Sequence, residues 1–136
     1  MPHKTLLLAI STLLFVTCHT AQKAQPAPLP GFVSWDKKMV ELGTVKRGEK
    51  RSMSYEFTNT FGENIQIDIV DACACTKVDF PRGVIEPGKK GRLDATFDST
   101  EKEKGETISI TIIFKNTHAN GVPRIEVVEY RFDIVP

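Results

Sequence analysis

From residue 32 to the C-terminus, apolar and polar residues alternate along most of the chain. A period of two places successive side chains on opposite faces of a strand, so that one face enters the core and the other meets water. The pattern therefore predicts half-buried strands, about seven in number. We expect them in the segments 32–35, 40–45, 52–58, 65–69, 92–98, 108–115 and 125–134.

Turn-forming residues separate the predicted strands, and several of these turns contain glycine, as at Gly62, Gly88 and Gly121. The charged stretch 99–106 lacks the apolar stripe of an amphipathic helix and is typical of a solvated loop. Short strands with frequent turns and no helical crossovers are typical of an all-β fold. We predict an antiparallel β-sandwich over residues 32–136.

The last predicted strand contains a change of phase. Ile125 and Val127 share one parity, whereas Val128, Tyr130 and the later apolar residues share the other. An extra residue in a strand shifts its register in this way. We therefore expect a bulge near Val127.

The N-terminal segment has the features of an export signal. Lys4 precedes an apolar stretch from Leu6 to Val16 that is interrupted by only two hydroxyl residues. Roughly 20 apolar residues are needed to span a bilayer, and a shorter stretch behind a basic residue is typical of a signal peptide. We expect residues 1–17 to be a signal peptide and the protein to be exported.

Cys18 directly follows this apolar stretch. The sequence FVTC at 15–18 resembles the bacterial lipoprotein box, in which the cysteine becomes the lipidated first residue of the mature chain. Acyl chains on Cys18 would hold the protein on a membrane. Ordinary cleavage near residues 18–21, which would give a soluble product, is the alternative.

A proline-rich segment follows at residues 18–31, with three prolines in its second half. Such segments are extended and semi-rigid, at about 3 Å per residue. We therefore divide the chain into a signal peptide (1–17), a tether (18–31) and a sandwich domain (32–136).

The composition limits the function classes. The chain has 136 residues, 40% of them apolar, which suffices for one modest core. Its formal charge of +1 becomes zero when residues 1–17 and their one basic residue are removed, so binding to nucleic acid is not expected. The sequence contains neither a Ser/His/Asp nucleophile motif nor a phosphate-cradling glycine loop. We expect a monomer that is not an enzyme and holds no cofactor.

If Cys18 is lipidated or removed, Cys73 and Cys75 are the remaining thiols, and an even pair in an exported chain favours a disulfide. On a regular strand, residues two apart have Cα atoms roughly 6.6 Å apart and nearly parallel Cβ vectors, whereas a disulfide needs Cβ atoms about 3.8 Å apart. Formation of this disulfide would therefore require a kink in the strand. A disulfide formed in this way would be easy to reduce, and so of redox rather than structural value.

Three interpretations of this pair stay open. Extending the parity of the 65–69 strand puts Cys73 and Cys75 on the core face with Asp71, as small buried hydrophobic side chains. A kinked strand end would instead give a redox-active dithiol. Two thiolates on one face could also hold Cu(I) or form half of a zinc site, but no third ligand is adjacent, and His118 falls in a predicted loop.

Four motifs carry a family resemblance. They read ELGTVKRG at 41–48, FTNT at 57–60, DACACT at 71–76 and IEPGKKG at 85–91. Taken together and in this order, they resemble the bacterial family called domain of unknown function 1573, over about residues 33–135. The resemblance implies an exported immunoglobulin-like sandwich without an established activity. In that family the cysteine segment commonly reads SCGCT, from which this chain departs by two alanines.

We predict an exported, lipid-anchored and non-catalytic module for protein binding or assembly in the cell envelope, in the periplasm or at the cell surface. Its partner would be an envelope protein, and an edge strand that accepts a partner's strand is one way to bind it. The alternative hypothesis is a thiol redox or Cu(I)-binding protein that acts through Cys73 and Cys75. The exposure of the two sulfur atoms and the distance between them separate the two hypotheses.

Overall fold

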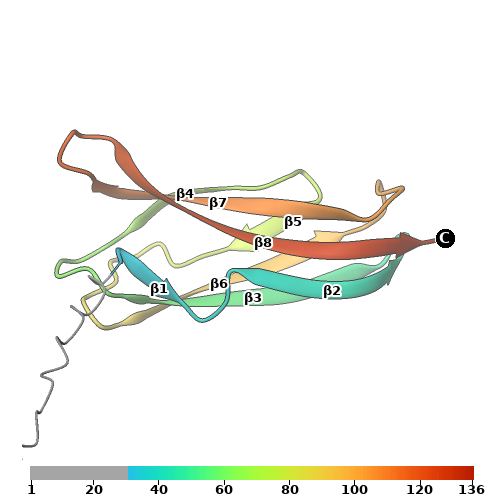
Figure 1. Ribbon diagram of the computed structural model, residues 1–136, viewed down its shortest axis with the longest axis horizontal. Coiled ribbons are helices and arrows are strands. Elements are labelled where there is room, and N and C mark those ends of the chain that lie inside the picture. The colour runs from blue at the N-terminus through green and yellow to red at the C-terminus, as the bar shows by residue number, and fades with distance from the viewer. Residues whose placement is uncertain (1–30) are drawn as a thin grey trace, which may run out of the picture.

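The computed structural model describes residues 31–136, which form two packed β-sheets (Figure 1). Each sheet has four strands. The strands are β1 (Val33–Trp35), β2 (Met39–Lys46), β3 (Lys50–Asn59), β4 (Ile67–Asp71), β5 (Thr76–Asp79), β6 (Lys90–Asp98), β7 (Glu106–Thr117) and β8 (Pro123–Val135). No helix among these residues is long and apolar enough to cross a membrane.

The predicted all-β sandwich is confirmed. One sheet has the order β1-β3-β6-β5 and the other has the order β2-β8-β7-β4, so the chain changes sheets after each of the first four strands and again after β6. The expectation of purely antiparallel pairing was wrong for one pair, because β2 runs parallel to β8. A strand near the start of the domain therefore pairs with the last strand, and the second sheet is mixed.

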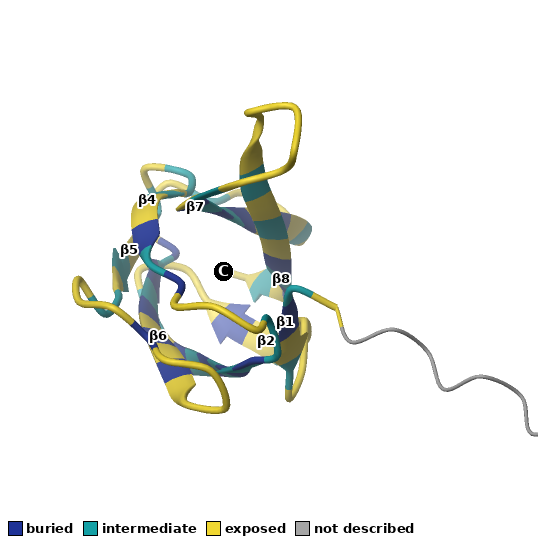
Figure 2. Cartoon of the chain, turned by 90° about the vertical axis from the view of Figure 1, so that its left-hand side faces the viewer, coloured by how far each residue is buried: buried dark blue, intermediate teal, exposed yellow. Residues whose placement is uncertain are grey.

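The core lies between the sheets and follows the predicted alternation. In β7, for example, Ile108, Ile110, Ile112 and Phe114 are buried while the residues between them are half-buried or exposed. Viewed along the strands, the buried segments line the space between the sheets and the exposed loops project outward (Figure 2). Six aromatic side chains fill much of this core: Tyr55, Phe57, Phe97, Phe114, Tyr130 and Phe132.

Two predictions about register were wrong. The irregularity in β4 lies between Ile67 and Ile69, so that Ile67 is buried whereas Ile69 is 53% exposed. The parity of the predicted 65–69 strand therefore does not continue into the core. From Ile125 to Val127 the β7–β8 ladder is regular, and its irregularity lies before Ile125, between Ile113 and Thr117 of β7. No bulge is needed there, because these two side chains simply face outward.

The strand β5 was not predicted. It is four residues long and contains one apolar residue, Val78. That is too short for a period of two to stand out. It nevertheless completes the first sheet by pairing with β6, and it begins directly after the two cysteines. The predicted signal peptide, Cys18 and all but the last residue of the predicted tether lie outside the described residues.

Candidate functional site

The segment that links β4 to β5 brings Cys73 and Cys75 together as a disulfide. Their Cα atoms are 5.2 Å apart, closer than the roughly 6.6 Å of a regular strand. The chain turns here, and the backbone N–H of Thr76 donates to the carbonyl of Cys73 at 2.9 Å. The structure therefore contains the kink that a disulfide at this spacing requires.

Of the three open interpretations, the one that placed Asp71, Cys73 and Cys75 on the core face as buried side chains was wrong. Asp71 is exposed, and both cysteines are only half-buried. The cause is the irregularity in β4, after which Val70 rather than Ile69 or Asp71 turns inward. The pair is therefore not part of the closed core, although it packs against the edge of it.

A cleft of about 540 Å³ lies beside the disulfide. One wall consists of the 73–75 segment, and the other comes from the β6–β7 loop, where no helix forms. The two walls are linked because the N–H of Asp98 donates to the carbonyl of Cys75 at 2.9 Å. The lining residues are Cys73, Ala74, Cys75, Asp98, Thr100, Glu101 and Lys102.

Asp98 shapes the loop wall of this cleft. Its carboxylate accepts hydrogen bonds from the backbone N–H of Thr100 at 3.0 Å and from its hydroxyl at 2.6 Å. These bonds, with a smaller contribution from Lys50, lower the pKa of Asp98. The carboxylate is therefore a stable acceptor that fixes the start of the loop.

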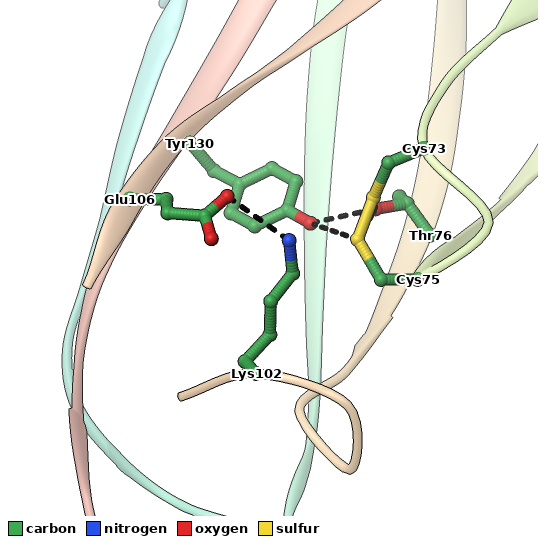
Figure 3. Close-up of polar contacts among 6 residues, drawn as sticks. All are labelled: Cys73, Cys75, Thr76, Lys102, Glu106 and Tyr130. Carbon is green, nitrogen blue, oxygen red and sulfur yellow. Dashed lines mark hydrogen bonds and ion pairs between the residues drawn. A yellow bond between two sulfur atoms is a disulfide. The ribbon is translucent and has the colours of Figure 1, made fainter. Parts of the chain in front are cut away.

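Two hydroxyl groups lie beside the disulfide, one from β5 and one from β8 (Figure 3). The hydroxyls of Thr76 and Tyr130 are 2.6 Å apart and hydrogen-bonded. The Sγ of Cys75 lies 3.6 Å from the Thr76 hydroxyl and 3.8 Å from that of Tyr130, and the Sγ of Cys73 lies 3.3 Å from the Thr76 hydroxyl. The sulfur of Cys75 therefore has two hydroxyl neighbours, whereas that of Cys73 has one.

Burial raises the pKa of Tyr130, and the negative charge of Glu106 raises it further, whereas the hydrogen bond with Thr76 acts in the opposite direction. The phenol therefore keeps its proton at neutral pH and can donate it to a hydrogen bond. Glu106 is itself paired with Lys102 at 3.0 Å, and the Lys102 side chain is only 16% exposed. A cation thus lies in the wall of the same cleft.

A second feature lies on the outer face of the β2-β8-β7-β4 sheet. Ile69 pairs with Ile113, and Ile113 pairs with Ile125, so these three side chains form one row across β4, β7 and β8. Val127 continues the row on the same face of β8. Ile69, Ile125 and Val127 are 53%, 52% and 40% exposed. We call these four residues the isoleucine row. It ends at β4, whose outer edge pairs with no strand among residues 31–136.

No group of three His, Cys, Asp or Glu side chains that could hold a metal occurs among residues 31–136. His118 is exposed in the β7–β8 turn, away from the cysteines in sequence and in strand order. In the disulfide form neither sulfur is a thiolate, and thiolates are the form in which cysteines bind soft metals. A Cu(I) site would therefore require the reduced pair.

Sequence reasoning identified Cys73 and Cys75 but missed Thr76 and Tyr130. Thr76 could have been found from the DACACT motif, since it directly follows the second cysteine. Tyr130 gave no signal beyond its core parity, because it lies 54 residues from Thr76 in the sequence. The isoleucine row was also missed, since it depends on the irregularity in β4.

The domain has two distinct ends. At one end, the Thr60 hydroxyl donates to the carbonyl of Gly31, the first described residue, just beyond the end of β3. At the other end, Asp98 pairs with Lys50, the first residue of β3, and bonds to Cys75. The chain therefore enters the domain at the end opposite the disulfide. The two ends are separated by the length of β3, which is roughly 30 Å for a strand of about ten residues.

Solved structures with this fold come from varied proteins. A protein of unknown function from Porphyromonas gingivalis W83 superposes with a TM-score of 0.62 at 17% identity, over 83% of this chain and 51% of that one. The PapD-like domain 7 of human CEP192 matches over 98% of both chains, with a TM-score of 0.58 and 10% identity. The VesB protease of Vibrio cholerae matches with a TM-score of 0.60 at 17% identity, over 75% of this chain and 32% of that one.

At these identities the likeness concerns the fold alone. The chain spans about a third of the VesB structure and about half of the Porphyromonas structure. No curated protein matches the sequence. The profile of the family described as "Protein of unknown function (DUF1573)" matches residues 33–128, which include β1 to β7, the disulfide and Val127. The chain therefore belongs to the DUF1573 family.

Proposed function

We propose that this protein is an exported, lipid-anchored and non-catalytic module that binds a protein partner in the cell envelope. The observation that carries the binding role is the isoleucine row beside the unpaired edge of β4. A free edge offers backbone N–H and C=O groups for strand addition, and neighbouring side chains give such binding its specificity.

The charges around β4 favour one kind of partner. Asp68 and Asp71 are exposed on either side of Ile69. A second copy of the same strand would bring these carboxylates close to its own, which disfavours pairing of β4 with β4. An extended segment that alternates apolar and basic side chains would cover Ile69 and pair with the carboxylates. We therefore propose such a segment of another envelope protein as the ligand.

The proposed anchor agrees with this arrangement. The apolar stretch before Cys18 supports export, and Cys18 supports attachment of lipid in the periplasm or at the cell surface. Since the chain enters the domain at the end opposite the disulfide, an N-terminal anchor would direct the cleft away from the membrane. The open β4 edge would stay accessible along the side.

We propose a non-catalytic role because no Ser/His/Asp nucleophile motif occurs in the sequence. His118 is the single histidine of residues 31–136, and it is exposed in a turn. The likeness to the VesB protease covers 32% of that chain, so it brings no protease machinery to this one. We therefore assign a binding role to the exposed edge of β4 and the isoleucine row.

We expect Ile69→Lys to abolish partner capture. The substitution removes the centre of the isoleucine row and places a cation where a basic partner segment would pair with Asp68 and Asp71. Purified protein would be used to capture proteins from detergent-solubilised envelope, and the retained partner measured by mass spectrometry. We expect at least a tenfold loss, which corresponds to about 1.4 kcal/mol of binding.

Val84→Lys is the matched control, because Val84 is an equally exposed apolar residue, at 56%, that lies in the β5–β6 loop and is not part of the isoleucine row. This variant should retain its partner. Equal capture by wild type and both variants, with all three folded, would contradict the assignment of the binding surface.

The disulfide supports a second candidate function, which is thiol redox chemistry through Cys73 and Cys75. The observation in its favour is that the bonded pair is half-exposed beside a cleft rather than enclosed in the core. We expect dithiothreitol to reduce the disulfide in the folded protein, with both thiols then reacting with iodoacetamide. A disulfide that resists reduction until the domain unfolds would eliminate this candidate.

A further inference from the structure

The two sulfur atoms of the disulfide have different surroundings. Cys75 has two hydroxyl neighbours, those of Thr76 at 3.6 Å and Tyr130 at 3.8 Å, whereas Cys73 contacts only that of Thr76, at 3.3 Å (Figure 3). In thiol–disulfide exchange the attacked sulfur forms the new bond and the other leaves as a thiolate, and the exchange is faster when that thiolate is more stable. Hydroxyl donors stabilise a thiolate, so this asymmetry favours Cys75 as the leaving sulfur.

The hydroxyl pair is held in place before any reaction. Tyr130 lies on the core face of β8 with no exposed surface, and its phenol is bonded to the Thr76 hydroxyl. Its raised pKa keeps it in the donating form. A donor that does not move is more effective than solvent, because its orientation costs no reorganisation during the reaction.

The disulfide also borders the cleft. Both cysteines line the cleft, and Lys102, from the β6–β7 loop, lines it opposite them. A nearby cation favours the thiolate form of an approaching thiol. The cleft therefore offers an approach to the disulfide for an incoming thiolate.

We propose that Cys73–Cys75 accepts two electrons from a dithiol partner, and that the Tyr130 hydroxyl, which itself accepts from Thr76, donates to Cys75 as the leaving thiolate. The proposal rests on the redox candidate given above. A thiolate of the partner attacks Sγ of Cys73, a partner–Cys73 disulfide forms, and the electron pair of the broken S–S bond leaves on Cys75.

The second thiolate of the partner then attacks its own first sulfur. The partner–Cys73 bond breaks, the partner becomes a disulfide, and Cys73 leaves as a thiolate. The two protons that the partner thiols released are taken up by Cys73 and Cys75 through solvent. The partner is oxidised by two electrons, and the cysteine pair of this protein is reduced by two.

The test compares two tyrosines that each lose one hydroxyl. Tyr130→Phe removes the donor beside Cys75. Tyr55→Phe is the matched control, because Tyr55 is equally buried but its hydroxyl bonds to Met53 and to the carbonyl of Glu129. The rate of disulfide reduction by dithiothreitol would be measured in the folded proteins. We expect Tyr130→Phe to slow it about tenfold and Tyr55→Phe to leave it unchanged.

Two further readouts separate a chemical role from a structural one. In the reduced protein, the pH dependence of alkylation should show that the thiol pKa of Cys75 rises by about one unit or more in Tyr130→Phe, because exchange rates change less steeply than thiol acidity. In the oxidised wild type, glutathione should form its transient adduct on Cys73, as located by fragmentation mass spectrometry. Thr76→Val, like Tyr130→Phe, should slow reduction of the disulfide and raise the thiol pKa of Cys75.

The outcomes are distinguishable. A wild-type disulfide that dithiothreitol does not reduce in the folded state would remove the redox function altogether. Normal reduction with an unchanged rate and pKa in Tyr130→Phe would leave the redox function standing and overturn the role of the hydroxyl pair. A glutathione adduct on Cys75 would reverse the assignment of the leaving sulfur.

Discussion

Replacing Cys18 by alanine should move nearly all of the protein from the membrane fraction to the soluble fraction. Each buried methylene contributes about 0.8 kcal/mol to membrane binding, and two or more acyl chains are needed for stable anchoring. Loss of the lipid should therefore have an almost all-or-none effect, measured by fractionation and by the mass of the N-terminal peptide.

Cys73→Ala is the control for this experiment, because it removes a cysteine without touching the proposed lipidation site. It should stay in the membrane fraction with its lipid intact. Membrane attachment and an N-terminal mass that are the same in Cys18→Ala and wild type would contradict the proposed anchor, while leaving the sandwich and its surfaces unaffected.

Phe57→Ala should destabilise the domain by about 3–5 kcal/mol, the usual cost of removing a buried phenylalanine ring. Phe57 has no exposed surface, and its ring packs against those of Trp35 and Phe114, at centroid distances of 4.9 and 6.2 Å. It therefore connects β1, β3 and β7 across the two sheets. Urea unfolding followed by tryptophan fluorescence or circular dichroism measures the loss.

Phe80→Ala provides the comparison, since Phe80 is only half-buried at the end of β5 and stacks with Arg82. Its cost should be less than half that of Phe57→Ala. A smaller loss for Phe57→Ala than for Phe80→Ala would mean that the two sheets do not pack around Phe57 as described.

Much of the fold was predictable because alternation reports directly on burial. The parity of β7 and β8 assigned the buried face correctly, including Ile110, Val128 and Phe132. The parallel pairing of β2 with β8 was not predictable in this way. Alternation assigns side chains to faces, but it does not say which strands are neighbours.

The candidate site was predictable only in part. The spacing of Cys73 and Cys75 showed that a disulfide would need a kink, and the structure contains both. Their burial depended on the irregularity after Ile67, where one residue out of phase moves every later side chain to the other face. The contact of Cys75 with Tyr130 arises from packing of the two sheets, which no local pattern encodes.

The same irregularity creates the surface on which the proposed function depends. With regular pairing, Ile69 would have joined Ile67 in the core, and the outer face of β4 would have carried Asp68 and Val70 instead. Instead the isoleucine row reaches the free edge of the sheet. Binding at this edge is the central claim.

Photo-crosslinking in the native envelope tests this claim most directly. A benzophenone side chain placed at position 69 or at position 125 lies on the isoleucine row, and one at position 84 has similar exposure outside it. We predict that positions 69 and 125 give a covalent adduct with the same envelope protein and that position 84 does not. Adducts absent from positions 69 and 125, or equally strong at all three positions, would contradict binding at the β4 edge.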